Sequence, residues 1–164
     1  MSEPLNNTLV AYFSVTGNTR KLAENLAQVA HADLFEIVPK KPYTEEDCDW
    51  HNPESRTSLE CNDSSSRPAI ATRVPNMEQY RNIFLGFPIW WYAAPRIIET
   101  FLESYDMEGK FIIPFCTSGS SDIGDSALIL QRDCDGKVVT GSRFEPDVFK
   151  GDLARWAIMQ KFYK

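Results

Sequence analysis

A hydroxyl-rich turn near the amino terminus has the residue types and spacing of a phosphate-binding loop. It follows an apolar run at 9–13, precedes a segment with helical spacing, and consists of Ser14, Val15, Thr16, Gly17, Asn18 and Thr19. Such a turn can aim backbone N–H groups and hydroxyls at one phosphate, while the next helix adds the positive end of its dipole. The turn contains no Lys or Arg and matches neither the nucleoside-triphosphate nor the dinucleotide glycine pattern. We therefore predict a terminal monophosphate held by neutral donors without a metal; the alternative is a polar turn with a Ser/Thr helix cap.

A second loop places adjacent aromatic side chains directly after the apolar run at 82–87. Its residues are Pro88, Ile89, Trp90, Trp91 and Tyr92. Aromatic rings at this position favour a flat ligand such as the isoalloxazine ring of a flavin, which an indole can stack against. Flavin mononucleotide (FMN) has both this ring and a terminal monophosphate. In the alternative interpretation, Trp90 or Trp91 closes the core under a neighbouring segment.

A third loop has only small side chains where the strand predicted at 110–116 ends. Its candidate residues are Thr117, Ser118, Gly119, Ser120 and Ser121, with Gly124 shortly after them. Small residues let backbone N–H groups approach the pyrimidine edge of a flavin, where hydrogen bonds tune its potential. An ordinary surface loop is the equal alternative.

The elements that must position these loops alternate between strand and helix. Strands are predicted at 9–13, 34–38, 82–87, 110–116 and 137–144, and helices at 18–30, 95–109, through Leu128 and Leu130, and at 148–163. Short right-handed crossovers then give an α/β fold: a doubly wound, open sheet of five parallel strands with helices on both faces. Ligands bind such sheets beyond the carboxyl ends of the strands, where all three loops begin.

One segment, at about 39–76, does not fit this alternation. It contains five prolines and a serine run, so we interpret the chain as one domain, 1–164, with a long insertion. Within the insertion, residues 44–47 are predicted to cap one helical turn, and Trp50 is predicted to anchor the segment on the body. The sequence leaves open whether the insertion covers the ligand, builds a dimer or meets a partner, and it leaves the oligomeric state open too.

Composition narrows the class of protein. The 164 residues carry a net charge of −6, which argues against a nucleic-acid partner. The apolar run at 83–94 is too short to span a bilayer, and the first residues do not resemble a secretory signal, so we expect a cytoplasmic protein without a membrane partner. The four cysteines lack metal-ligand or disulfide spacing, and we expect them to be reduced.

One cysteine pattern suggests a different chemistry. Residues 61–67 satisfy Cys-x5-Arg, the spacing that places a thiolate and a guanidinium around one phosphate in cysteine phosphatases. Such a loop should leave a buried strand and enter a helix, whereas this one lies among polar residues and contains Asp63. A phosphatase is therefore a remote alternative.

Over nearly its whole length the chain resembles the flavodoxin-like family. The turn at 14–19 is similar to the flavodoxin phosphate signature, residues 87–91 with Pro95 to the flavin loop of NAD(P)H:quinone oxidoreductases, and 117–119 with Gly124 to the third flavin loop of both groups. The resemblance implies non-covalent FMN and electron transfer at the exposed flavin edge.

The second loop departs from the electron-carrier members of that family. Carriers usually have a glycine beside flavin N5, and residues 88–92 have none, so an NAD(P)H:quinone-type reductase that transfers a hydride is the alternative to a carrier. The expected partner is accordingly a redox protein or a small molecule of the NAD(P)H or quinone type. Neither His31 nor His51 lies in a recognisable catalytic pattern, so no catalytic residue is assigned.

Overall fold

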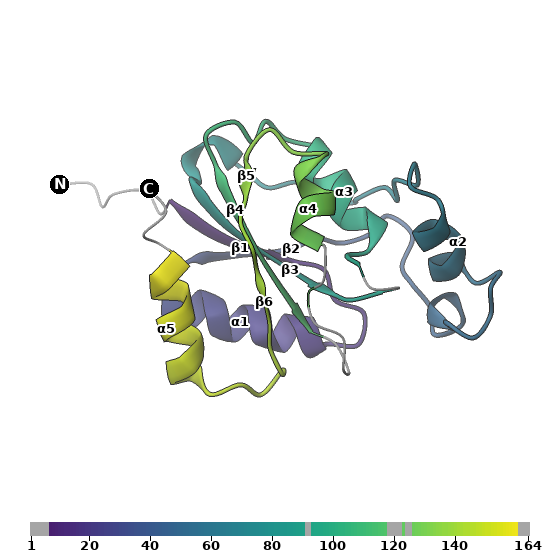
Figure 1. Ribbon diagram of the computed structural model, residues 1–164, viewed down its shortest axis with the longest axis horizontal. Coiled ribbons are helices and arrows are strands. Elements are labelled where there is room, and N and C mark those ends of the chain that lie inside the picture. The colour runs from purple at the N-terminus through teal and green to yellow at the C-terminus, as the bar shows by residue number, and fades with distance from the viewer. Residues whose placement is uncertain (1–6, 91–92, 118–122, 124–125, 161–164) are drawn as a thin grey trace.

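The structure, a computed structural model, describes residues 7–90, 93–117, 123 and 126–160. Its centre is a sheet with the strand order β2-β1-β3-β4-β5, in which every neighbouring pair is parallel (Figure 1). The strands are β1 (Thr8–Tyr12), β2 (Asp33–Glu36), β3 (Asn82–Pro88), β4 (Phe111–Thr117), β5 (Lys137–Val138) and β6 (Ser142–Arg143). This order reverses between β1 and β3 as in flavodoxin-like sheets, so the predicted fold class is confirmed.

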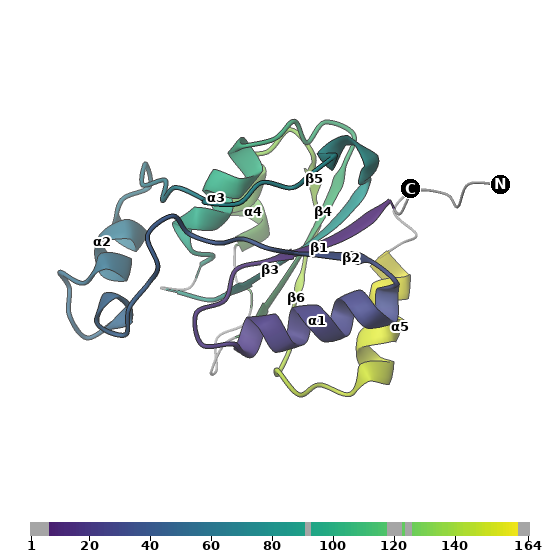
Figure 2. The same cartoon turned by 180° about the vertical axis from the view of Figure 1, so that it is seen from behind.

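Helices cover both faces of this sheet. The α-helices are α1 (Asn18–Ala30), α2 (Arg56–Asn62), α3 (Arg96–Glu103), α4 (Ser126–Gln131) and α5 (Lys150–Gln160). Helices α1 and α5 lie on one face, and α3 and α4 on the other (Figures 1 and 2). Strand β3 serves both layers, because Phe84 packs toward α1 while Leu85 and Phe87 belong to the opposite core. Burial on both faces explains why β3 reads as one apolar run.

The bounds of α1 agree with the sequence prediction, whereas those of α3 do not. Helix α1 has the predicted bounds. Helix α3 ends at Glu103 rather than near Gly109, and Pro95 is its N-cap rather than its first helical residue. After the last turn, the Ser104 hydroxyl donates to the Thr100 carbonyl at 2.6 Å. Apolar spacing alone therefore overestimated the length of this helix.

The fifth strand is interrupted where a single strand over 137–144 was predicted. Segments β5 and β6 both pair with β4, and the fifth strand has one more residue than β4 between the two ladders. Pro114 of β4 has no N–H to donate at this level. A Cβ on Gly141 would lie 1.9 Å from the Pro114 carbonyl oxygen. The bulge therefore reflects a missing donor together with a very close backbone approach.

The insertion forms a lobe beside the sheet edge at which β3 ends (Figure 1). It contains α2 and the 3-10 helix η1 (Glu46–Cys48); η2 (Met77–Gln79) follows it. The predicted cap at 44–47 is confirmed by reciprocal bonds of 3.0 and 3.1 Å between Thr44 and Asp47. The prediction for Trp50 is wrong, since this residue is 64% exposed. Helix α2 was not predicted, because its buried residues, Thr57 and Ser58, are polar.

The returning part of the insertion is tied to the body. Backbone bonds join Ala71 N–H to Val38 O at 2.7 Å and Lys40 N–H to Ala69 O at 2.8 Å. Arg67 donates through Nε to both carboxylate oxygens of Glu103, at 3.0 and 2.9 Å, and its Nη2 lies 3.2 Å from a Glu99 oxygen. The lobe is therefore held at its base by both backbone and charged contacts.

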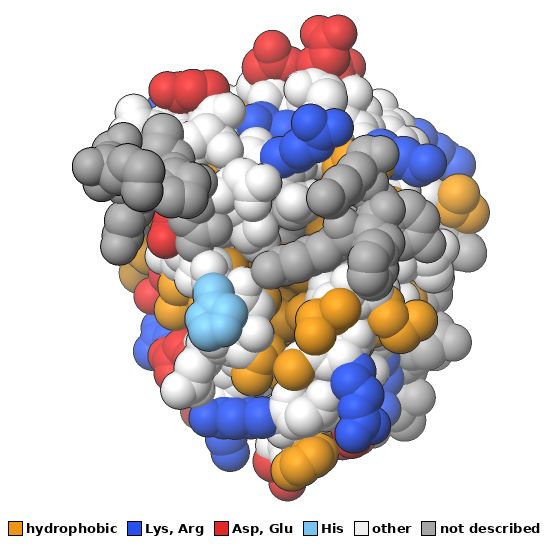
Figure 3. Space-filling model, turned by 90° about the vertical axis from the view of Figure 1, so that its left-hand side faces the viewer, with side chains coloured by type: hydrophobic (Ala, Val, Ile, Leu, Met, Phe, Trp, Pro, Cys, Tyr) orange, Lys and Arg blue, Asp and Glu red, His pale blue; other side chains and the backbone are white. Residues whose placement is uncertain are grey.

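The opposite end of the molecule, around α5, presents a mixed surface. Its described side chains carry both signs of charge, with apolar groups between them (Figure 3). In the described part of the chain, no helix is both long and apolar enough to cross a bilayer.

Candidate functional site

The loop between β1 and α1 leaves the first turn of α1 open to an outside acceptor. Gly17 is the N-cap residue, and no side chain caps this helix within the described structure. The first N–H groups of a helix have no intrahelical acceptor. The alternative prediction, a turn with a Ser/Thr cap, is therefore wrong. The free N–H groups lie at the positive end of the helix dipole.

Gly17 is required for its backbone conformation. Its φ is 95°, in the left-handed region that side-chain-bearing residues rarely adopt. A Cβ added there would meet no described protein atom within 4 Å, so the backbone conformation, and not crowding by the protein, calls for glycine. The Ser14 hydroxyl accepts from Gly17 N–H at 3.1 Å and so holds the turn. Val15, Thr16 and Asn18 are exposed around it, and Thr19 is buried.

The cation next to this turn is already paired. Arg20 Nη2 lies 2.7 Å from Glu36 Oε2, and this contact, together with Tyr12, raises the pKa of the guanidinium. The donors that the turn offers to a ligand are therefore neutral backbone and hydroxyl groups. This donor set fits a phosphate dianion bound at a helix terminus.

The second loop begins one residue later than predicted, because Pro88 still belongs to β3, and the Trp90 ring packs against the body. Its centroid lies 5.6 Å from that of Phe13 and 5.3 Å from that of Tyr43, both edge-on. These contacts match the alternative in which Trp90 closes the core under the insertion, although the residue remains partly exposed. The Trp90 and Ala93 backbones exchange two hydrogen bonds, at 2.9 and 3.1 Å. Pro88 and Ile89 are partly buried, while Trp91 and Tyr92 lie outside the described residues.

The third loop starts at a buried threonine. The Thr117 side-chain oxygen lies 2.8 Å from that of Thr19, and its carbonyl accepts Ile89 N–H at 3.1 Å. Residues from all three predicted loops, Thr19, Ile89 and Thr117, therefore meet at the carboxyl edge of the sheet. The remaining candidates of this loop, Ser118, Gly119, Ser120, Ser121 and Gly124, lie outside the described residues.

The insertion contributes a wall that the sequence did not reveal. Tyr43 donates to Glu60 Oε1 at 2.6 Å, and the Arg56 guanidinium lies 3.7 Å from the centre of its ring. Burial and Glu60 raise the pKa of Tyr43, so its phenol stays protonated. A cavity of about 210 Å³ lies between the insertion and the phosphate turn, lined by Phe13, Ser14, Val15, Glu36, Val38, Pro39, Pro42 and Tyr43. No local sequence pattern around Tyr43 predicts that it lines this cavity.

The Cys-x5-Arg segment does not form a phosphatase loop. Cys61 lies at the end of α2 rather than before a helix, and Arg67 is paired with Glu99 and Glu103. Burial raises the pKa of the Cys61 thiol to about 11. A phosphatase nucleophile needs the opposite shift, because the thiolate is the reactive form.

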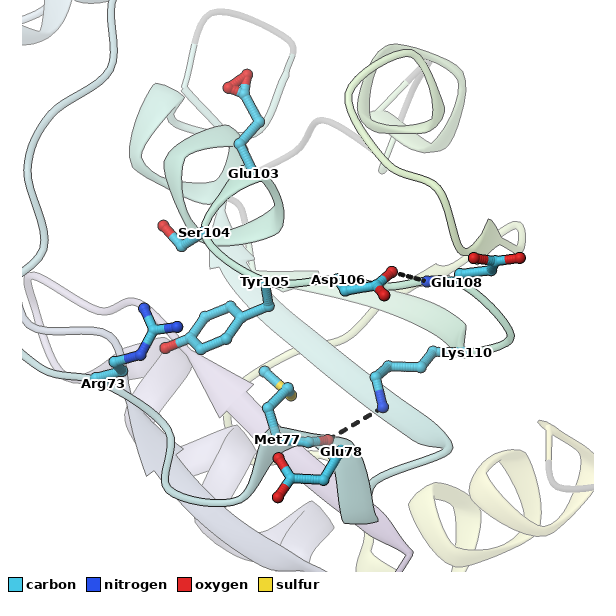
Figure 4. A pocket seen from close by; sticks show the side chains of 9 residues that line it. All are labelled: Arg73, Met77, Glu78, Glu103, Ser104, Tyr105, Asp106, Glu108 and Lys110. Atoms are coloured by element: carbon cyan, nitrogen blue, oxygen red, sulfur yellow. Dashed lines mark hydrogen bonds between the residues drawn. The ribbon is translucent and has the colours of Figure 1, made fainter.

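A larger cavity, of about 700 Å³, lies at the opposite, amino edge of the strands (Figure 4). Its polar groups are engaged in structural contacts: Lys110 Nζ donates to the carbonyls of Met77 and Tyr80, and the Arg73 guanidinium lies over the Tyr105 ring. Ligands of doubly wound sheets bind at the carboxyl ends of the strands, and this cavity lies at the amino ends. Among the described residues, no group of three or more His, Cys, Asp or Glu side chains could hold a metal ion.

Fold and site together define a flavodoxin-like α/β protein in which the uncapped turn at 14–19 suits a phosphate. A family model described as Flavodoxin matches residues 7–159, and the chain belongs to this family. A search of curated proteins finds no match.

Solved structures support the same assignment. A candidate flavoprotein from Bacteroides eggerthii is 42% identical, with a TM-score of 0.86 over 93% of this chain and 96% of that one. Another, from Bacteroides uniformis, is 43% identical, with a TM-score of 0.86 over 92% and 97%. A Lactobacillus acidophilus flavoprotein solved in complex with FMN is 21% identical, with a TM-score of 0.65 over 84% and 93%, and shares the fold.

The state of Cys61 leads to a test of the phosphatase alternative. Because its pKa lies about two units above the ordinary value, its thiolate should be roughly 100-fold scarcer than that of a free thiol near pH 8. We expect slow alkylation of Cys61 by iodoacetamide in the native protein, accelerating as the pH approaches 11, as followed by mass spectrometry. The urea-unfolded protein is the control and should react rapidly. Fast native alkylation at pH 7, with phosphatase activity lost in step, would contradict this interpretation.

Proposed function

We propose that this chain is an FMN-dependent oxidoreductase that exchanges electrons at the exposed edge of its flavin. As a member of the flavodoxin family it is an FMN-binding, flavodoxin-like protein. The proposal depends above all on one observation: the uncapped first turn of α1 behind a left-handed Gly17. Its donors are neutral and lie at the N-terminus of a helix, which suits a single terminal phosphate.

The described residues divide the binding work between the two ends of the cofactor. The turn at 14–19, the α1 dipole and the Thr19 hydroxyl would hold the phosphate, while Pro88, Ile89 and Trp90 would border the ring. When bound, FMN supplies a group that accepts and releases electrons together with protons. The packed rings of Phe13, Tyr43 and Trp90 would form an apolar border on one side of the site.

The sequence of the second loop favours a reductase over a one-electron carrier. It lacks the glycine that gives carriers a mobile peptide at this position. An aromatic loop without this glycine suits a planar substrate lying against the flavin, so we infer a partner of the NAD(P)H or quinone type, with a redox protein as the alternative.

A cytoplasmic location is part of this proposal. Among the described residues the cysteines form no disulfide, as expected of a reducing compartment.

Replacing Gly17 tests the phosphate site. Gly17→Val should weaken FMN binding by at least about tenfold, because a branched residue resists the left-handed conformation and turns the loop N–H groups away. Fluorescence titration of the apoprotein with FMN measures this. Gly109→Val is the matched control: Gly109 also has a positive φ, 78°, with open space around it, but lies at the amino edge. Equal FMN affinity of Gly17→Val and the parent would refute the assigned role.

Anaerobic reduction tests the proposed reaction. We expect NADH or NADPH to bleach the visible absorbance of the FMN-loaded protein, and a quinone to restore it, because the aromatic sequence of the second loop suits a planar substrate. Stopped-flow absorbance follows both steps. If neither nucleotide bleaches the flavin while a ferredoxin-type reductase does, the protein is a carrier instead.

A further inference from the structure

Three segments far apart in the sequence meet at Thr117. Its side chain is buried and reaches Thr19 in the first turn of α1, with 2.8 Å between the two Oγ1 atoms. Its carbonyl accepts the N–H of Ile89 in the second loop. Its own chain begins the third loop. From its sequence position Thr117 was assigned to the flavin ring, yet its hydroxyl points toward the phosphate turn.

The two hydroxyls share one hydrogen bond, and its direction matters. Each hydroxyl has a single proton, and either oxygen can be the donor. If Thr117 donates, the proton of Thr19 stays available for another acceptor. If Thr19 donates instead, it can offer only lone pairs to its surroundings.

A phosphate dianion decides between these two directions. It has acceptor atoms only, so beside Thr19 it favours the arrangement in which Thr19 donates to it. Thr117 is then the group that supplies Thr19 with a hydrogen bond. Hydrogen bonds in such a chain strengthen one another in a buried environment, and Thr19 and Thr117 are 1% and 6% exposed.

We propose that Thr117 is a positioning residue for the cofactor phosphate, acting through Thr19 by a two-hydroxyl relay. The inference rests on the proposed function, since it requires FMN with its phosphate in the turn at 14–19. It assigns to the third flavin loop a part in recognising the phosphate. The relay also couples the end of β4 to the first turn of α1.

The relay makes Thr117 selective for flavins with a phosphate. Removing the Thr117 hydroxyl should weaken the binding of FMN and leave riboflavin, which has the same ring without the phosphate, unaffected. A residue that merely packs the loop would change the affinity for both ligands.

The test compares Thr117→Val, which keeps the shape and removes the hydroxyl, with Thr117→Ser, which keeps the hydroxyl. Fluorescence titrations of the apoproteins with FMN and with riboflavin measure dissociation constants. We expect a roughly tenfold loss of FMN affinity for Thr117→Val, the magnitude of one weakened bond to a charged group. Riboflavin affinity should stay within about twofold of the parent, and Thr117→Ser should restore FMN binding. Thr100→Val, on α3, is the control and should bind FMN like the parent.

A double-mutant cycle gives a second, independent readout. Thr19→Val should lower FMN affinity at least as much as Thr117→Val, because it removes the group that meets the phosphate. The double variant should be no worse than Thr19→Val alone, since the relay has no further effect once Thr19 cannot donate. Thermal melts of each apoprotein establish that it is folded, and Thr117→Ala replaces Thr117→Val if the latter is not.

The outcomes separate this inference from the proposed function. FMN affinity unchanged in Thr117→Val, equal losses for FMN and riboflavin, or additive losses in the cycle would each overturn the relay while leaving FMN binding intact. Failure of the parent protein to bind FMN would refute the proposed function and the relay with it.

Discussion

The left-handed conformation of Gly17 is the constraint on which the site depends. It turns the chain from β1 into α1 without a side-chain cap, so the first N–H groups of α1 are left for a ligand. A Ser, Thr or Asp cap in place of this Gly would stabilise the helix by only about a few tenths of a kcal/mol, and this chain forgoes that small contribution. The helix is stable without it because Leu22, Ala23 and Leu26 are buried against the sheet. The binding site is therefore supported by hydrophobic packing on the other side of the same helix.

The topology brings the rest of the site to this turn. Strands β1, β3 and β4 are neighbours in one parallel sheet, so the loops that follow them leave the same edge. Thr117 joins these loops by hydrogen bonds, and the insertion adds a wall of aromatic side chains through Tyr43. The insertion is itself fixed by Arg67, which contacts Glu99 and Glu103. A segment that looks like an irregular excursion in the sequence thus helps to shape the site.

Local signals in the sequence predicted the parts of the fold that local physics determines. The bounds of α1 follow from Gly17 and an apolar stripe, and the buried strands follow from their β-rich apolar runs. Contacts between distant residues decided the rest. The break in the fifth strand depends on Pro114 facing Gly141, the packing of Trp90 depends on Tyr43 of the insertion, and the partner of the Thr117 hydroxyl lies 98 residues away. Helix α2 was missed because polar residues fill its buried positions.

Phosphorus NMR of the FMN complex across pH tests the central claim most directly. A free phosphate monoester takes up its second proton near pH 6. Neutral N–H and O–H donors that grip the dianion should lower this pKa, because they bind the charged form. The account predicts a phosphorus shift that stays constant from about pH 5 to 8. A signal that titrates near pH 6, as in free FMN, would show that the phosphate lies outside the turn at 14–19.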